Sequence, residues 1–105
     1  MPTLSEHINV YGTALQVLKD KGYQLWFEPE TRIYRAERDG WDFAAHTPCG
    51  LLGVVAIFEH RQPTKYEEYW WRKEEVDELA LPHEPRPYNS VLATQGRGPR
   101  PPRHE

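Results

Sequence analysis

Residues 47–60, "TPCGLLGVVAIFEH", contain the longest apolar run in the chain and decide the fold prediction. The run itself, residues 51–58, is far shorter than the ~20 apolar residues needed to cross a bilayer. Pro48 and Gly50 precede the run, and both are typical turn residues. A short, continuous apolar run is typical of a central strand covered on both faces. We therefore expect residues 47–50 to form a turn and residues 51–60 to form a strand.

Residues 33–45, "IYRAERDGWDFAA", precede this run and predict a β-hairpin. A two-residue Asp39-Gly40 loop would place Glu37 opposite Asp42, and like charges in that position are destabilising. A four-residue loop over residues 37–40 gives an aromatic pair on one face and an opposite-charge pair on the other. We therefore expect the longer loop, with the pairs Ala36–Trp41, Arg35–Asp42 and Tyr34–Phe43.

The chain before the hairpin predicts one helix and one strand. Ser5 is a suitable N-cap, and Gly22 stands where a helix often takes a left-handed terminal residue. Between them, an apolar stripe at helical spacing indicates a helix over residues 6–21: Ile8, Tyr11, Leu15 and Leu18. Residues 23–28 alternate as a strand, which places Trp26 on the face opposite Tyr23, Leu25 and Phe27.

Residues 64–81, "TKYEEYWWRKEEVDELAL", are compatible with two structures. Thr64 and Glu67 have the spacing of a capping box, and the apolar residues roughly follow helical spacing, so a helix is favoured. The alternative is an edge strand over residues 65–72 followed by a short helix, because Tyr-Trp-Trp has a strong strand propensity.

Residues 82–105 hold six of the ten prolines in the chain. We expect residues 82–94 to be extended and packed on the body through Tyr88, Val91 and Leu92. Residues 95–105 predict a disordered, Pro/Arg-rich tail. Residues 1–94 then form a single compact α+β domain of two layers. It contains an N-terminal helix, a four-stranded, mainly antiparallel sheet, a C-terminal helix and the extended tail.

Composition restricts the compartment and the partners. The single cysteine excludes an intramolecular disulfide and is typical of a reducing cytosol, and residues 1–12 lack the pattern of a signal peptide. We therefore expect a soluble, cytoplasmic protein. Residues 1–81 carry 9 Lys or Arg against 14 Asp or Glu, which argues against a nucleic-acid surface. The tail carries 4 Arg against 2 Glu, which leaves weak nucleic-acid binding through the tail as an alternative.

Cys49 is the one candidate nucleophile of the thiol type. His46, three residues earlier, and His60, at the far end of the apolar run, are its candidate bases. Since Cys49 precedes a predicted strand, we expect no helix N-terminus beside it to favour the thiolate, and a small buried side chain is the simpler interpretation. A thiol-dependent enzyme therefore remains an alternative. We expect no metal site and no cofactor, since a second thiol and a Gly-rich phosphate loop are both missing.

Aromatic residues are the most unusual feature of the chain, which has 13 Phe, Trp and Tyr residues. Three consecutive rings cannot share one helix face, so at least one of Tyr69, Trp70 and Trp71 should be exposed or covered by the tail. Exposed Trp and Tyr are typical of protein interfaces. We therefore expect a non-catalytic protein that binds or regulates a protein partner through an acidic, aromatic-rich surface built from Trp26, Tyr69, Trp70 and Trp71. A homodimer through this surface fits the same pattern.

Overall fold

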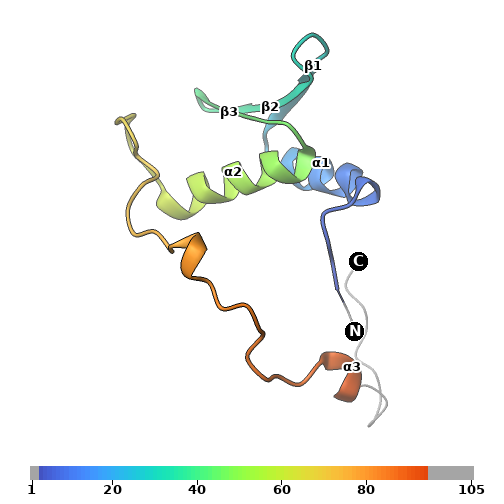
Figure 1. Ribbon diagram of the computed structural model, residues 1–105. Helices are drawn as coiled ribbons and strands as arrows, with labels where there is room; N and C mark the ends of the chain where they lie inside the picture. Colours follow the sequence, from blue (N-terminus) through green and yellow to red (C-terminus); the bar gives the residue numbers. More distant parts are fainter. Residues whose placement is uncertain (1–2, 95–105) are drawn as a thin grey trace. The chain divides into compact units, whose positions relative to one another are not determined.

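A computed structural model describes residues 3–94 of the chain (Figure 1). The chain divides into two units. The first comprises residues 6–75 and contains the sheet and the two long helices. The second comprises the residues up to Ser5 and those from Val76 onward. Within its described part it contains the 3₁₀ helix η2 (Glu78–Ala80) and the short helix α3 (Val91–Thr94).

The first unit is an α+β structure of two layers. Its elements are the 3₁₀ helix η1 (Ile8–Val10), α1 (Tyr11–Asp20), β1 (Gln24–Glu28), β2 (Ile33–Arg38), β3 (Trp41–Ala45) and α2 (Pro48–Arg61). The strands form an antiparallel sheet in the order β1-β2-β3, and α1 and α2 lie together against one of its faces (Figure 1). The predicted α+β class with an antiparallel sheet is confirmed, but the sheet has three strands and not four.

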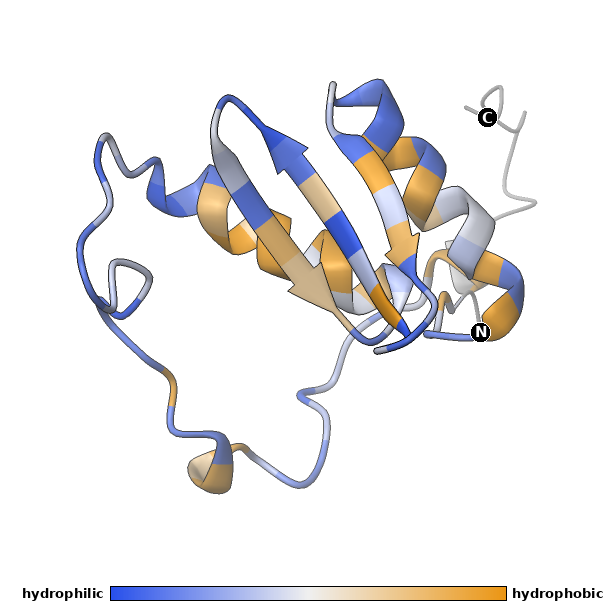
Figure 2. Cartoon of the chain, turned by 90° about the horizontal axis from the view of Figure 1, so that it is seen from above, coloured by the Kyte–Doolittle hydropathy of each residue, from blue (hydrophilic) through white to orange (hydrophobic). Residues whose placement is uncertain are grey.

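Residues 51–60 are helical, so the predicted central strand is wrong. Thr47 caps α2, because its Oγ1 accepts a hydrogen bond from the Gly50 N–H at 2.8 Å, and Pro48 occupies the start of the helix, where its missing N–H costs nothing. Leu51 and Val55 are fully buried one helical turn apart. The helix is apolar along most of its length (Figure 2), so the continuous run that predicted a strand belongs to a helix. Length and capping, and not hydrophobicity, distinguish these alternatives.

The N-terminal helix is close to its predicted position but begins later. The regular turns start at Tyr11, and the preceding 3₁₀ turn is capped by His7, whose side chain accepts from the Asn9 N–H; Ser5 is not the cap. Gly22 ends the helix with φ of +95°, as expected of a left-handed terminal residue.

The predicted hairpin register is wrong as well. Glu37 pairs with Asp42 and Ala36 with Phe43, so the loop is the two-residue Asp39-Gly40 turn. Both loop residues have positive φ, +54° and +84°, as a type I′ turn requires. This register places Ala36 and Phe43 side by side in the core, where both are buried. Burial of this pair therefore outweighs the repulsion between two carboxylates on the face that carries no helices.

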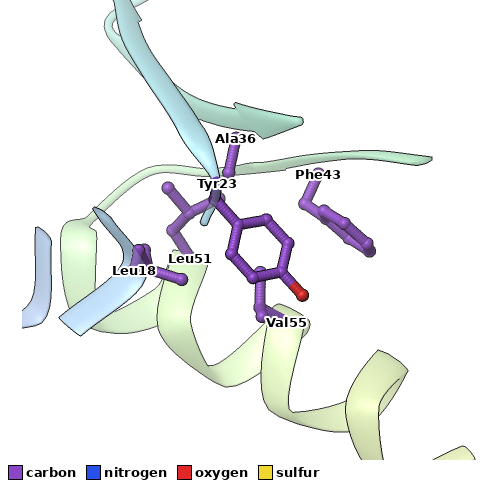
Figure 3. Close-up of a cluster of buried hydrophobic side chains, with 6 residues drawn as sticks. All are labelled: Leu18, Tyr23, Ala36, Phe43, Leu51 and Val55. Carbon is purple, nitrogen blue, oxygen red and sulfur yellow. The ribbon is translucent and has the colours of Figure 1, made fainter. Parts of the chain in front are cut away.

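The core lies between the sheet and the two helices. Figure 3 shows the Tyr23 ring lying among Leu51 and Val55 of α2 and Phe43 of β3, with Leu18 of α1 and Ala36 of β2 nearby. These six side chains are all at most 5% exposed. Each strand contributes residues of one alternation phase, so the sheet is apolar toward the helices, and its other face carries mainly polar side chains together with Trp26.

Residues 62–75 form irregular turns, so neither the favoured helix over residues 64–81 nor the alternative edge strand over residues 65–72 is present; a short 3₁₀ helix, η2, follows only at Glu78–Ala80. Tyr69 has φ of +57°, which neither a helix nor a strand accepts. The Trp70 N–H donates to Glu67 O, and the Arg72 N–H donates to Tyr69 O, so tight turns replace a helical or strand ladder. Residues 82–94 belong to the second unit, and their packing on the body stays a prediction. The predicted disordered tail, residues 95–105, lies outside the described residues.

Candidate functional site

A chain of aromatic rings leads from the core to the surface at the β3 side of the first unit. Phe43 contacts Phe58 of α2, with ring centroids 5.0 Å apart. Phe58 contacts Trp41 at 5.1 Å, and Trp41 contacts Trp70 at 5.6 Å with nearly perpendicular ring planes. Edge-to-face contacts of this kind add to the stabilisation that comes from area burial. Trp70 is therefore partly a core residue, and it attaches residues 62–75 to the sheet and to α2.

Arg61, in the last turn of α2, holds the same segment through its backbone. Its guanidinium donates hydrogen bonds to Trp71 O at 3.2 Å and to Glu74 O at 3.3 Å. Trp71 lies beyond this anchor, with its ring 5.8 Å from Trp70 and 40% of its surface exposed. The segment therefore presents Trp71 at the surface from a fixed backbone position.

The strand β3 has a free edge. Trp41 and Arg38 flank the two-residue turn and form a hydrogen-bonded pair. Every second residue of β3 is hydrogen-bonded to β2 in the same way, so the backbone N–H and C=O groups of Trp41, Phe43 and Ala45 point toward β2. The N–H and C=O groups of Asp42 and Ala44 consequently point away from β2. Within residues 3–94, no strand pairs with this edge. An unpaired edge is a template on which another extended segment can hydrogen-bond.

A groove of about 320 Å³ runs beside this free edge. We call it the edge groove. It is lined by Asp42, Phe43 and Ala44 of β3, by Val54 and Ile57 of α2, and by Trp70 and Trp71. Ile57, which lines this groove, is 45% exposed. The groove therefore combines free backbone hydrogen-bonding groups with apolar and aromatic walls.

A second, more polar hollow of about 480 Å³ adjoins the start of β3. We call it the aromatic pocket. Three aromatic rings contribute to its lining, and the full set of lining residues is Gly40, Trp41, Asp42, Thr64, Lys65, Tyr66 and Trp70. Asp42 and Trp70 border both hollows, so the edge groove and the aromatic pocket share a wall.

The structure does not bring all the predicted interface aromatics together. Trp26 pairs with Arg35 in the middle of β1 and β2, on the sheet face opposite the helices, and it is 44% exposed. Tyr69, Trp70 and Trp71 lie on the other side of the sheet, at the β3 edge. The two predicted parts of the aromatic surface are therefore separate.

The predicted thiol site is also divided. Cys49 lies in the first turn of α2 and is half-buried, so the expectation that no helix N-terminus lies beside it is wrong. His60 lies in the last turn of the same helix, about 16 Å away at 1.5 Å per residue. His46 is exposed, and no hydrogen bond within residues 3–94 joins it to Cys49. The length of α2 thus places His60 out of reach of Cys49.

A polar cluster closes the opposite end of the core. The Tyr23 hydroxyl donates to Glu59 Oε2 at 3.1 Å, and Lys21 Nζ lies 2.8 Å from Glu59 Oε1. Burial, followed by the hydrogen bond to Glu59, raises the pKa of Tyr23 to about 12. The hydrogen bond from Lys21 is the main cause that holds the pKa of Glu59 below its ordinary value. The Arg38 guanidinium lies over the Tyr23 ring, 4.5 Å from its centroid, so a cation–π contact adds to the Lys21–Glu59 ion pair in this cluster.

Three further findings concern metal ligands, membrane-spanning helices and similarity to known proteins. Among the described residues, no three His, Cys, Asp or Glu side chains gather as metal ligands would. None of the helices described is long and apolar enough to span a bilayer. Comparison with protein-family models, with curated proteins and with solved structures finds no match.

Several residues of the edge groove and the aromatic pocket were not predicted from the sequence, notably Trp41, Ala44, Ile57 and Tyr66. One signal for them was present. The Thr47-Pro48 pair is a helix start, and Leu51, Val55 and Phe58 then follow at helical spacing. A helix at this position would have left β3 as a sheet edge. The inward position of Trp70 had no comparable signal, because it depends on the irregular turns of residues 62–75.

Proposed function

We propose that this chain is a small, non-catalytic binding module that takes an extended segment of a protein partner along the free edge of β3. The observation that carries this proposal is the edge groove, where the outward backbone groups of Asp42 and Ala44 lie beside Phe43, Ile57 and Trp71. A segment added to a sheet edge gains affinity from main-chain hydrogen bonds and gains specificity from side-chain pockets. Alternate residues of the partner would enter the groove.

The proposal keeps Trp70 and Trp71 as partner-binding residues and assigns them different tasks. Trp70, held by Trp41 and Phe58, is a rigid wall of the groove. Trp71 is the exposed ring that an incoming side chain would cover. Exposed tryptophan beside a well-packed aromatic is a typical arrangement for an interface residue that contributes strongly to affinity.

A proline scan at the strand edge tests the proposal. The Ala44 N–H points away from β2, so Ala44→Pro removes a donor from the free edge without removing a hydrogen bond of the sheet. Ala44→Val is the matched control, since it keeps the N–H and favours a strand. The probe is a set of random twelve-residue peptides selected by display against the wild-type chain.

We expect selected peptides to protect the Asp42 and Ala44 amides from hydrogen exchange, to bind Ala44→Val normally and to lose at least about tenfold in affinity for Ala44→Pro. Peptides that bind both variants equally, or that protect other amides, would contradict the proposal. So would a selection that yields no binding peptide. The other possible occupant of the β3 edge is a second copy of this chain, and ultracentrifugation of the free chain detects such a dimer. If the wild type forms a dimer and Ala44→Pro does not, the edge binds a second copy and not a partner peptide.

A further inference from the structure

We infer that the aromatic pocket binds a cationic side chain, arginine or lysine, of the partner segment, an inference that rests on the proposed function. The pocket adjoins the edge groove through Asp42 and Trp70, so one residue of a segment lying in the groove can reach it. The chemistry of its walls and the unusual charge pattern of the hairpin both indicate a cation.

The charge pattern is the first argument. Glu37 and Asp42 are directly opposite each other on β2 and β3, although like charges in this position are unfavourable. The Glu37 carboxylate accepts the Gly40 N–H at 2.9 Å, whereas no residue between 3 and 94 donates a hydrogen bond to the Asp42 carboxylate or forms an ion pair with it. The hairpin therefore retains, at a residue that lines the pocket, a carboxylate that has no hydrogen-bond or ion-pair partner among the described residues. Places where a fold retains a local conflict of this kind are often functional.

The rings are the second argument. Trp41, Tyr66 and Trp70 all line the pocket, and the planes of the two tryptophans are inclined at 75°, with the ring centroids 5.6 Å apart. Aromatic faces attract cations through their quadrupole, and tryptophan does so most strongly. Nearly perpendicular rings in a pocket that an acidic residue also lines are suited to hold a guanidinium or an ammonium group. The same chain already uses this contact, because Arg72 lies 4.9 Å from the Tyr69 ring centroid.

Lys65 provides an internal check on the inference. It is the cation among the residues that line the pocket, and within the described part of the chain it forms no ion pair. A bound cation would be repelled by Lys65, so removal of that charge should strengthen binding. A pocket that merely accepts an apolar group would not respond in this way.

The experiment uses two probes that differ in charge, N-acetyl-arginine amide and its uncharged analogue N-acetyl-citrulline amide. Each is titrated into the isotope-labelled full chain, and the four indole N–H signals are followed by NMR. We expect arginine amide to shift the signals of Trp41 and Trp70 saturably in about the millimolar range while that of Trp26 stays in place, and citrulline amide to bind at least about threefold more weakly.

Three variants complete the test. Asp42→Asn should weaken the arginine response about threefold, Lys65→Gln should strengthen it about twofold, and Glu30→Gln, an exposed acid at the other end of the sheet, should leave it unchanged. Equal responses to the two probes, or an unaltered response in both Asp42→Asn and Lys65→Gln, would overturn the inference. Ala44→Pro separates this outcome from failure of the proposed function. Ala44→Pro should leave the response to arginine amide unchanged. A wild-type chain that binds the selected peptides but does not respond to arginine amide rejects the cation site alone. A wild-type chain that responds to arginine amide but binds no peptide at the β3 edge rejects strand addition alone.

Discussion

Tyr23 joins the apolar core to the polar cluster at its end. Its ring is 4% exposed and lies among Leu51, Val55 and Phe43 (Figure 3). Its hydroxyl donates a hydrogen bond to Glu59. A buried hydroxyl that lacks a partner is costly, so the hydrogen bond to Glu59 determines where the ring can sit. This residue therefore couples the position of the sheet to that of α2.

Tyr23→Phe should lower the free energy of unfolding by about 1–2 kcal/mol, because a hydrogen bond to a charged acceptor is lost while the ring remains. Urea denaturation at pH 7 measures this loss. Tyr66→Phe, at a tyrosine that is 73% exposed, is the control and should change stability by less than about 0.5 kcal/mol. In the wild type, the raised pKa of Tyr23 stabilises the fold below pH 10 and this contribution disappears as the pH rises toward 12, so Tyr23→Phe should also flatten the alkaline limb.

Acid should weaken the same cluster from the other side. The pKa of Glu59 in the folded chain lies below its ordinary value of 4.5, chiefly because Lys21 donates to the carboxylate. The resulting stabilisation is complete above pH 4.5 and is lost as the pH falls through the lowered pKa. Glu59→Gln should therefore reduce the slope of stability against pH below 4.5. A remaining slope is expected, since Arg35 and Thr31 hold the pKa of Glu28 low as well; an unchanged slope in Glu59→Gln would contradict the assignment.

At the scale of single elements, the two-residue turn fixes the register of the β2–β3 hairpin and so determines which residues line the β3 edge. Gly40 has φ of +84°, and nothing lies within 4 Å of the place where its Cβ would be. Any cost of a side chain there is consequently conformational and not steric, which makes this turn a clean place to measure its contribution.

Gly40→Ala should lower the free energy of unfolding by about 1 kcal/mol, because an L side chain is strained at this φ. Gly53→Ala is the opposite control. Gly53 lies within α2 and is also free of contacts within 4 Å, so alanine should stabilise the helix by about 0.5–1 kcal/mol. Thermal and urea unfolding of the two variants should move in opposite directions. A shift of both in the same direction would mean that backbone conformation does not govern these positions.

The elements that could be predicted were those with redundant local signals. The α1 stripe with Gly22 behind it and the alternation of residues 23–28 both led to the observed structure. The apolar run of α2 led to a wrong strand prediction because residues 51–58 are apolar on all sides of the helix, so the helical periodicity is weak. The caps at Thr47 and Gln62 are the features that distinguish a helix from a strand here. The register depended on burial of Ala36 with Phe43, a tertiary effect that local charge pairing could not reveal. The edge groove needed both of these results, so it could not be predicted.

At the scale of the whole unit, residues 62–75 belong to the fold although they have no regular structure. Trp70 packs on Trp41 and Phe58, and Arg61 binds the backbone at Trp71 and Glu74. The same segment forms one side of the edge groove and the aromatic pocket. Its order is therefore a condition for both proposed sites.

Trp70→Ala should lower the free energy of unfolding by about 2–3 kcal/mol, less than for a fully buried tryptophan because the ring is half-buried. Trp71→Ala should cost less than about 1 kcal/mol, since much of that ring is exposed. Limited proteolysis should show faster cleavage within residues 62–75 for the first variant and an unaltered rate for the second. Equal losses of stability would show that Trp70 is not the residue that anchors the segment.

The packing of α1 against α2 also has a consequence for the speed of folding. Each strand pairs only with its neighbour in sequence, through turns of a few residues. The helices α1 and α2 also contact each other, but all three strands lie between them in the sequence. Local contacts close rapidly, and distant contacts carry the larger entropic cost. We expect the two hairpins to form early and the meeting of the two helices to limit the rate. The unit should then refold in about milliseconds in stopped-flow experiments, as small mixed α/β domains do.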